Sequence, residues 1–524
     1  MKALFSRIFI PALAAVLVCT SLGGCDTASA VSAQSGVSSS SAASSSASKK
    51  AHTTSLTHIT IPYAMNLSMN PFTANSMINL NLWPLLYDCL SEPDKSFSPR
   101  LELASAIHVS GTSVSITLRS GVVFTDGSAL TASDVVYSLQ LAMQTPSSYF
   151  HSRTTNFASV SSNGSQGVVI TLKTSDPLVA NLLDIPIIKA GSDQNSIPTG
   201  SGRYTISKSG NNEVLTANAS WYLHKTPKVK TITLLDMPDN DSIASCLSIG
   251  EVNYILSDYG TDALTVVNDS STYIDLNQLL FMGVNCSSSL LSDARVRRAL
   301  SLIVDRTAIA TEIYSSHAAA ACLPFDPSFS KMAKTPAADL SPRLDDAIDA
   351  LKTAGYTAKN ATGVLTKSED GKQTPLTFNL IVNKADSQRC ATAQIISQEF
   401  KNEGISLKVS AVDINTFTDD LKSGAYDLYL SEIKLPDDMD VSSFFEAGGT
   451  AAYGTPGAAS TFYSVFEKWR AGIEKTTSLS AAFEDETPFI PLIYRQGTVS
   501  YPKSFFSNIT ATNHNIFFNI QDWQ

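Results

Sequence analysis

From residue 56 onward, the spacing of apolar and polar positions changes repeatedly, which predicts a body of mixed strands and helices. Short apolar or alternating runs predict strands at 113–118, 168–173 and 230–235. Between them, Thr131 and Asp134 precede a helical apolar pattern, so we predict a capping box in which the Asp134 carboxylate returns to the amide of Thr131. This mixture favours an α/β or α+β body.

A second helix is predicted from the helical spacing of apolar residues between Val296 and Ile303. Arg295, Arg297 and Arg298 occupy its other faces. We expect these three arginines to face solvent.

The stretch from 376 to 431 alternates between strand patterns and helix patterns. The predicted order is strand 376–382, helix 387–403, strand 405–412, helix 415–422 and strand 427–431. Gly404 and Gly424 follow the two helices, where glycine commonly ends a helix. This βαβαβ order predicts parallel strands joined by crossover helices.

Three aspartates follow the last of these strands, namely Asp437, Asp438 and Asp440. Ligands of α/β sheets commonly bind at the carboxyl ends of strands, so these side chains are candidates for a binding site. A solvated loop that caps a helix at 441–445 explains the same residues equally well.

The N-terminus has the pattern of a secretory signal. Lys2 and Arg7 precede an apolar run at 8–18, which is shorter than the ~20 residues that a membrane-spanning helix needs. The run ends in Leu22-Gly23-Gly24-Cys25, which resembles a bacterial lipobox, and we predict lipidation of Cys25. The Ser- and Ala-rich run that follows cannot pack and is predicted to be a flexible tether.

Composition and charge exclude several classes of function. The chain has 47 acidic and 37 basic residues and a net charge of -10, so binding to nucleic acid is not expected. Five scattered cysteines remain after Cys25. Their number is odd and no two of them form a CxxC pair, and whether one incidental disulfide forms is left open. We find no P-loop, dinucleotide-binding glycine motif, nucleophile elbow or HExxH motif, and the seven histidines are dispersed. We therefore expect no enzyme activity, no cofactor and no metal.

Several segments together resemble the extracellular solute-binding proteins of family 5, the oligopeptide- and dipeptide-binding lipoproteins of ABC transporters. The most specific is LRSGVVFTDGSALTASDVVYSL at 118–139. DARVRRALSLIVDRTAI at 293–309 and TPFIPLIY at 487–494 match further family motifs, and 517–523 fits the family's terminal strand. The resemblance spans residues 56–524.

This resemblance implies an α/β fold with two lobes, the periplasmic-binding-protein (venus-flytrap) fold of class II, cluster C, with an extra subdomain. Lobes of this kind close over a ligand. The implied segments are a signal peptide at 1–25, a tether at 26–55, lobe I at 56–91, 191–283 and 486–524, an extra subdomain of lobe I at 92–190, and lobe II at 284–485.

In peptide-binding relatives, an aspartate after the second-lobe strand takes the α-ammonium group of the ligand. Asp437 matches it, and Asp438 and Asp440 are alternatives for that role. Relatives also pair the peptide backbone like an added strand. The matching positions are Asn75, Ser76 and Met77 in the first lobe and Ile433, Lys434 and Leu435 in the second. The family's tryptophan ahead of the aspartate is absent, and 462–486 looks shortened relative to the usual two helices.

The resemblance predicts a monomeric, lipid-anchored receptor outside the cytoplasm that binds peptides and delivers them to the permease subunits of an ABC importer. Two other functions remain open. In the first, the altered pocket serves a non-peptide solute, such as a metal chelate or an oligosaccharide. In the second, the chain is a surface peptide sensor that is not coupled to import.

Overall fold

The structure is a computed structural model that describes residues 57–524, apart from 211, 238–239, 259–269, 333–339 and 503. These described residues belong to one compact unit. The predicted signal peptide, Cys25 and the tether lie outside the described residues. The predicted boundaries of the lobes stay a prediction, and the fold is described here by its sheets.

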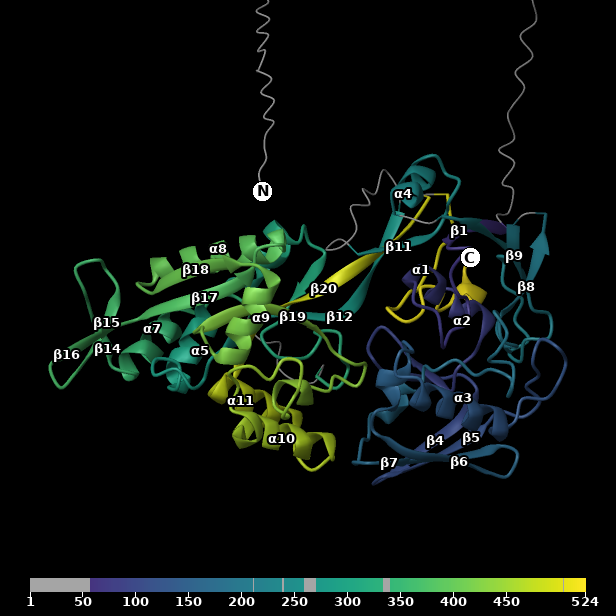
Figure 1. Cartoon of the computed structure of the whole chain (residues 1–524), viewed down its shortest axis with the longest axis horizontal. Helices are drawn as coiled ribbons and strands as arrows, with labels where there is room; N and C mark the ends of the chain where they lie inside the picture. Colours follow the sequence, from purple (N-terminus) through teal and green to yellow (C-terminus); the bar gives the residue numbers. More distant parts are fainter. Residues whose placement is uncertain (1–56, 211, 238–239, 259–269, 333–339, 503) are drawn as a thin grey trace, which may run out of the picture. The chain divides into compact units, whose positions relative to one another are not determined.

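One four-stranded sheet has the order β1-β10-β9-β8 (Figure 1). Its strands are β1 (His58–Tyr63), β10 (Thr231–Asp236), β9 (Asn212–Ala217) and β8 (Tyr204–Ser209). β1 pairs with β10 in parallel, and the other pairs are antiparallel. The neighbouring helices are α1 (Met77–Leu80), α2 (Trp83–Leu86) and α4 (Asn240–Ser248).

A second four-stranded sheet lies within 92–190 and has the order β4-β5-β7-β6. Its strands are β4 (Ala104–Ser110), β5 (Ser113–Leu118), β7 (Gly167–Leu172) and β6 (Phe157–Asn163), and the small ladder of β2 (Ser91–Pro93) and β3 (Pro99–Leu101) precedes them. Helix α3 (Ala132–Gln144) contacts β6 and β7. The predicted capping box is confirmed, because the Asp134 carboxylate accepts a hydrogen bond from the Thr131 amide at 2.9 Å.

The largest sheet has the order β11-β20-β12-β19-β17-β18, and β13 also pairs with β20. Its strands are β11 (Ile255–Asp258), β20 (Phe489–Tyr501), β12 (Ser270–Val284), β19 (Leu428–Lys434), β17 (Thr377–Asn383), β18 (Ser406–Val412) and β13 (Ala318–Ala320). The parallel pairing of β17 with β18 and β19 confirms the predicted βαβαβ unit. Its helices, α8 (Ser387–Asn402) and α9 (Ile414–Ser423), are followed by Gly404 and Gly424, both at positive φ.

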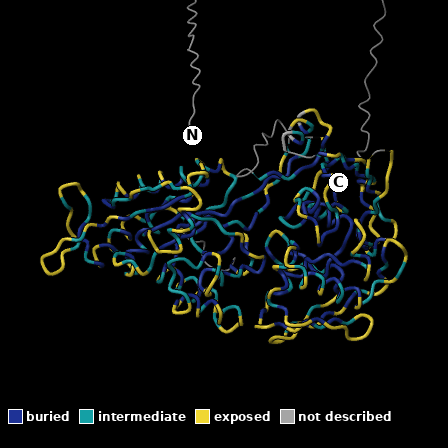
Figure 2. The backbone as a smooth tube through the Cα atoms, viewed as in Figure 1, coloured by how far each residue is buried: buried dark blue, intermediate teal, exposed yellow. Residues whose placement is uncertain are grey.

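The remaining elements surround this sheet. They are α5 (Ala294–Ile303), α6 (Arg306–Ala308), α7 (Leu344–Thr353), α10 (Thr461–Arg470), α11 (Thr476–Glu486) and the ladder of β14 (Tyr356–Lys359), β15 (Leu365–Glu369) and β16 (Lys372–Pro375). β20 supplies residues to the three largest buried apolar clusters: Val499 to the first, Ile490 to the second and Phe489 to the third. A fourth, smaller cluster around Ile243 and Val252 contains no residue of β20. Figure 2 shows buried, intermediate and exposed residues along the backbone, and β12 and β20 are buried over most of their length.

Three predictions are corrected. Arg297 is buried rather than solvated, because its guanidinium donates to the carbonyls of Leu291 and Ser292 and to those of Glu486 and Thr487. The segment 517–523 contains a short 3-10 turn at Ile520–Asp522 instead of a strand. The stretch 462–486 carries two helices, α10 and α11, so it is not missing one.

Candidate functional site

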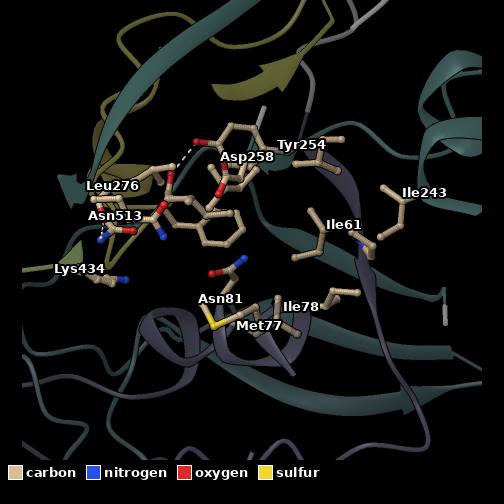
Figure 3. Close-up of a pocket in the computed structure, with 17 residues that line it drawn as sticks. Ile61, Met77, Ile78, Asn81, Ile243, Tyr254, Asp258, Leu276, Lys434 and Asn513 are labelled. Carbon is tan, nitrogen blue, oxygen red and sulfur yellow. Dashed lines mark hydrogen bonds between the residues drawn. The ribbon is translucent and has the colours of Figure 1, made fainter. Parts of the chain in front are cut away.

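A cavity of about 400 Å³ lies among segments that are distant in the sequence (Figure 3). Its size falls within the ~300–1,000 Å³ range of small-molecule sites, at the lower end. Its apolar walls come from β1, α1, α4, β11, β12 and the C-terminal segment. They include Ile61, Met77, Ile78, Ile243, Tyr254, Leu276 and Ile516. The polar lining residues are Asn81, Asp258, Gln278, Lys434 and Asn513.

Two of the residues that the resemblance implied for ligand binding line this cavity. Met77 begins α1, and its side chain is 50% exposed, which is high for a methionine beside a cavity. Lys434 ends β19 and is exposed. Both are therefore accessible to a ligand in the cavity.

The neighbours of these two residues have different surroundings. Asn75 is exposed, and Ser76 is the extended residue before α1, but neither is among the lining residues. Ile433 is half-buried in β19, and Leu435 is buried in the third apolar cluster. Since successive strand residues point to opposite faces, Lys434 reaches the cavity where Ile433 and Leu435 do not.

One charge at the cavity is neutralised within the protein. Arg495, from β20, forms ion pairs with Asp258 and, at 2.9 Å, with Glu432. Lys434 differs, because no carboxylate of the described residues lies within ion-pair distance of its ammonium group; its nitrogen stands 5.8 Å from the centre of the Tyr149 ring. Lys434 thus offers a positive charge to a ligand on the cavity wall.

One edge of β19 is partly open. β19 pairs with β12 along its whole length, from Leu428 to Lys434. On its other side, the described pairing with β17 involves Leu428 and Tyr429 alone. The later residues of β19 therefore present a strand edge that could accept the backbone of an extended ligand.

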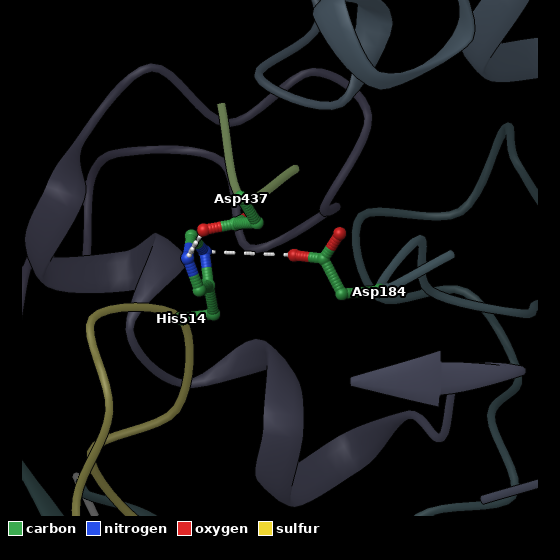
Figure 4. A group of neighbouring side chains, drawn as sticks. All are labelled: Asp184, Asp437 and His514. Atoms are coloured by element: carbon green, nitrogen blue, oxygen red, sulfur yellow. Dashed lines mark hydrogen bonds and ion pairs between the residues drawn. The ribbon is translucent and has the colours of Figure 1, made fainter. Parts of the chain in front are cut away.

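Asp437 lies in a buried network of ion pairs (Figure 4). Its Oδ1 atom is 2.6 Å from Nε2 of His514 and accepts a hydrogen bond of 2.6 Å from Nδ2 of Asn277. Arg153 forms a bidentate pair with Asp184, at 2.5 and 2.7 Å, and Nδ1 of His514 lies 3.5 Å from Asp184. Two acids and two bases thus compensate each other when the imidazole is protonated.

The ionisation of Asp437 and His514 reflects this pairing. Burial alone would raise the pKa of Asp437, but the charge and hydrogen bond of His514, together with Arg153, outweigh it and lower that pKa. Burial alone would lower the pKa of His514, but Asp437 and Asp184 outweigh it and raise that pKa above its ordinary value. The charged pair is therefore favoured near neutral pH.

The other two aspartates of the predicted site bind an arginine. Arg470, at the end of α10, pairs with Asp438 at 2.7 Å, Asp440 at 3.1 Å and Asp176 at 2.8 Å. Burial and the neighbouring acids raise the pKa of Asp438 to about 7, although Arg470 opposes this change. Of the two interpretations of this aspartate run, a solvated loop does not apply to Asp437 and Asp438, which are both buried.

Ligand atoms of Asp184, Asp437 and His514 lie within 4.8 Å of one another, which is close enough to hold a metal ion. Arg153 already supplies a cation here, because its guanidinium binds both oxygens of Asp184 and Nη2 lies 3.2 Å from Nδ1 of His514. The carboxylates are therefore satisfied by protein cations.

Sequence reasoning missed the partners of these aspartates. His514 lies 77 residues after Asp437, and Arg153 lies 361 residues before His514. No motif spacing joins them. A lone histidine and a lone arginine carry no signal of burial in a sequence, so the structure was needed to bring them together.

All five described cysteines have free thiols. Of the helices that the structure describes, none has the length and apolar character to cross a membrane.

Comparisons with known proteins agree with this architecture. The profile of the bacterial extracellular solute-binding proteins, family 5, matches residues 98–454. The oligopeptide-binding protein AppA of Bacillus subtilis is 26% identical over 377 residues, which cover 66% of this chain and 66% of that protein. The chain thus matches about two thirds of that relative's length.

Solved structures show the same fold. AppA of Bacillus subtilis, in complex with a nonapeptide, superposes with a TM-score of 0.55 at 20% identity, covering 89% of this chain and 98% of the other. A nickel ABC transporter structure from Bacillus halodurans gives a TM-score of 0.71 at 18% identity, covering 88% and 97%. These neighbours share the two-lobed fold. Because the family profile covers more than half of the sequence, the chain belongs to the bacterial extracellular solute-binding proteins, family 5.

Proposed function

We propose that this protein is the solute-binding receptor of an ABC importer, and that it binds peptides in the cavity beside β19 and delivers them to the permease. The observation that carries this proposal is the cavity that Lys434, at the end of β19, lines, together with the partly unpaired edge of the same strand. A strand edge binds the backbone of any peptide through main-chain hydrogen bonds, while the cavity receives side chains. The cavity volume of about 400 Å³ fits a short peptide.

Charged groups would fix the orientation of the peptide. Lys434, which lacks a carboxylate partner among the described residues, would bind the α-carboxylate or an acidic side chain of the ligand. Asp437 would take the α-ammonium group, as the resemblance implies, and this contact requires His514 to move away from it. Asp438 and Asp440 are held by Arg470 and are weaker candidates.

The remaining parts of the proposal concern the location and the segments of the chain. A lipid on Cys25 would anchor the protein to the outer face of the cell membrane, and the Ser- and Ala-rich run would act as its tether. With the lobe boundaries that the resemblance implies, the cavity and Asp437 would lie where the segments of lobe I meet those of lobe II. Closure of the lobes over a peptide would present the liganded form to the permease.

Native mass spectrometry of the purified full chain tests this proposal. Co-purified peptides, released and sequenced, would support it and would give the ligand length directly. An empty protein that also shows no rise in melting temperature with a mixed peptide digest would contradict it. A bound metal chelate or oligosaccharide would instead support the open alternative of a non-peptide solute.

The substitution Asp437→Asn tests the proposed role of this residue. It should weaken binding of a free-amine peptide library far more than binding of the same library after N-acetylation, measured by calorimetry. Asp440→Asn is the matched control, because Asp440 is held by Arg470 and by Ser442. Equal losses on both libraries would remove Asp437 from ammonium binding.

A further inference from the structure

One carboxylate oxygen of Asp437 already contacts two groups of the protein itself. The residue is 3% exposed, and Oδ1 contacts Nε2 of His514 and Nδ2 of Asn277, both at 2.6 Å. His514 belongs to the C-terminal segment, in which its neighbour Asn513 lines the cavity. For a ligand ammonium group that approaches from the cavity, the position beside Oδ1 of Asp437 is therefore already taken by the imidazole of His514.

The imidazole resembles an ammonium group in the features that matter here. When protonated, it carries one positive charge and donates a short hydrogen bond to Asp437. Next to it, Asn277 Oδ1 is buried and has no hydrogen-bond partner among the described residues. This acceptor would suit the further N–H groups that an ammonium group has and an imidazole lacks.

From this geometry we infer that His514 is a specificity-determining residue, an internal competitor that occupies the ammonium position of Asp437 until a ligand amine displaces it. The inference rests on the proposed function, because it concerns a ligand that bears an amine. As a consequence, the affinity for a ligand amine depends on how strongly Asp437 binds the protonated imidazole of His514.

The competition depends on the protonation of His514. Neutral imidazole can still donate from Nε2 to Asp437 while Nδ1 accepts from Arg153, but this neutral hydrogen bond is weaker than the charged one. The competitor is therefore strongest at low pH and weakens as pH rises. Displacement of the protonated ring releases up to one proton, so the affinity for an amine should rise by up to about tenfold per pH unit.

Other charged groups face this histidine and have to be considered. Asp437, Asp184 and Tyr149 raise its pKa, and Arg153 contacts its ring. A second cavity of about 120 Å³, which His514 also lines, is bordered by Asp94, Lys95 and Asp275. Asp438, the next residue after Asp437, also changes its charge between pH 5.5 and 7.5, because its pKa is raised to about 7. The His514 variants therefore have to separate the contribution of the imidazole from that of Asp438.

The experiment measures the affinity of the full chain for a synthetic pentapeptide library and for the same library after N-acetylation, by calorimetry from pH 5.5 to 7.5. The α-amino groups stay largely protonated over this range because their pKa is about 7.7–8.0. For the wild type, we expect the affinity for the free-amine library to rise with pH while the affinity for the acetylated library stays constant. The same rise for both libraries, or no rise for either, would overturn the inference.

Two substitutions of opposite effect sharpen the test. His514→Phe removes the competing cation, so it should raise the affinity for the free-amine library at pH 5.5 by about tenfold or more and flatten the pH profile. His514→Arg carries a permanent cation and should lower that affinity at every pH. His108→Phe is the control, because His108 is exposed on β4. If His514→Phe does not fold, the pH profile of the wild-type affinity and the affinity of His514→Arg test the competitor role of His514.

The outcomes also separate this inference from the proposed function. Peptides that bind the wild type and both His514 variants with equal affinity would contradict the competitor role alone. Failure of both libraries to bind the wild type at any pH would contradict peptide binding itself, and the inference would fall with it.

Discussion

Two neighbouring regions at the end of β19 differ in whether their charged side chains have partners of opposite charge within the protein. The region after the strand, around Asp437 and Asp438, pairs its buried carboxylates with His514 and Arg470. The cavity wall at the end of the strand leaves the ammonium group of Lys434 without a carboxylate partner among the described residues. Groups that are already paired hold the protein together, whereas an accessible unpaired charge is available to a ligand. The comparison thus contrasts charges that a ligand can reach only by displacing a partner within the protein with a charge that a ligand can reach directly, and substitutions can test it.

The largest effect is expected for Arg470→Met. This change leaves Asp176 and Asp438 buried without their cation, and loss of one partner of a buried ion pair costs about 3–5 kcal/mol. Urea unfolding should show this loss. Arg295→Met is the control, because its pair with Asp293 is at the surface and should contribute nothing measurable. Equal losses of stability in the two variants would contradict a stabilising role of the buried ion pairs of Arg470.

Lys434→Met should leave stability unchanged and weaken binding. A hydrogen bond to a charged group contributes about 1.5–3 kcal/mol, so the affinity for peptides with a free carboxylate should fall roughly ten- to hundredfold. Calorimetry with the free-acid library and a C-terminally amidated one measures this. Lys434→Arg keeps the charge and should retain most of the affinity. A comparable loss with the amidated library would assign Lys434 a role other than carboxylate binding.

The pH dependence of stability should reveal the paired region. The pKa of His514 is raised in the folded protein, so its stabilising contribution is present below the ordinary pKa of about 6.5 and is lost as pH rises through the raised value. Each tenfold increase in proton affinity on folding corresponds to about 1.4 kcal/mol of stability. Asp438, with its pKa raised to about 7, acts in the same direction, because the native state holds a proton that the unfolded chain has released.

Urea unfolding from pH 5.5 to 8 should therefore show a falling free energy of unfolding. His514→Phe should make this decline shallower, whereas His108→Phe should not change it. An unchanged slope in His514→Phe would show that the imidazole is not charged in the folded protein.

The smallest effect is expected for Met77→Ala. This side chain is 50% exposed, so its truncation should change the free energy of unfolding by less than about 0.5 kcal/mol. Ligand binding would cover it, and each methylene removed from water contributes about 0.8 kcal/mol, so affinity should fall severalfold. A loss of stability larger than the loss of affinity would place Met77 among the structural residues.

The sequence predicts local structure better than it predicts the site. The βαβαβ unit from β17 to β19 agrees within a few residues, because apolar periodicity and the glycines after α8 and α9 are local signals. Met77 and Lys434 line the cavity. Their roles in binding stay predictions.

The charge partners could not be predicted in this way. The local pattern puts Arg297 in solvent, but the carbonyls that bury it belong partly to the end of α11, far along the chain. Likewise, His514 and Arg153 reach Asp437 and Asp184 through tertiary packing alone. Burial of a charge depends on which distant groups surround it, and that information is not contained in local spacing.

The placement of β20 has a consequence for the order of events during synthesis. This strand contributes side chains to the three largest apolar clusters, and the first cluster also contains Phe517 and Trp523. Domains generally fold as units during synthesis. Because β20 spans Phe489–Tyr501, the three largest clusters cannot be completed before this strand has been synthesised.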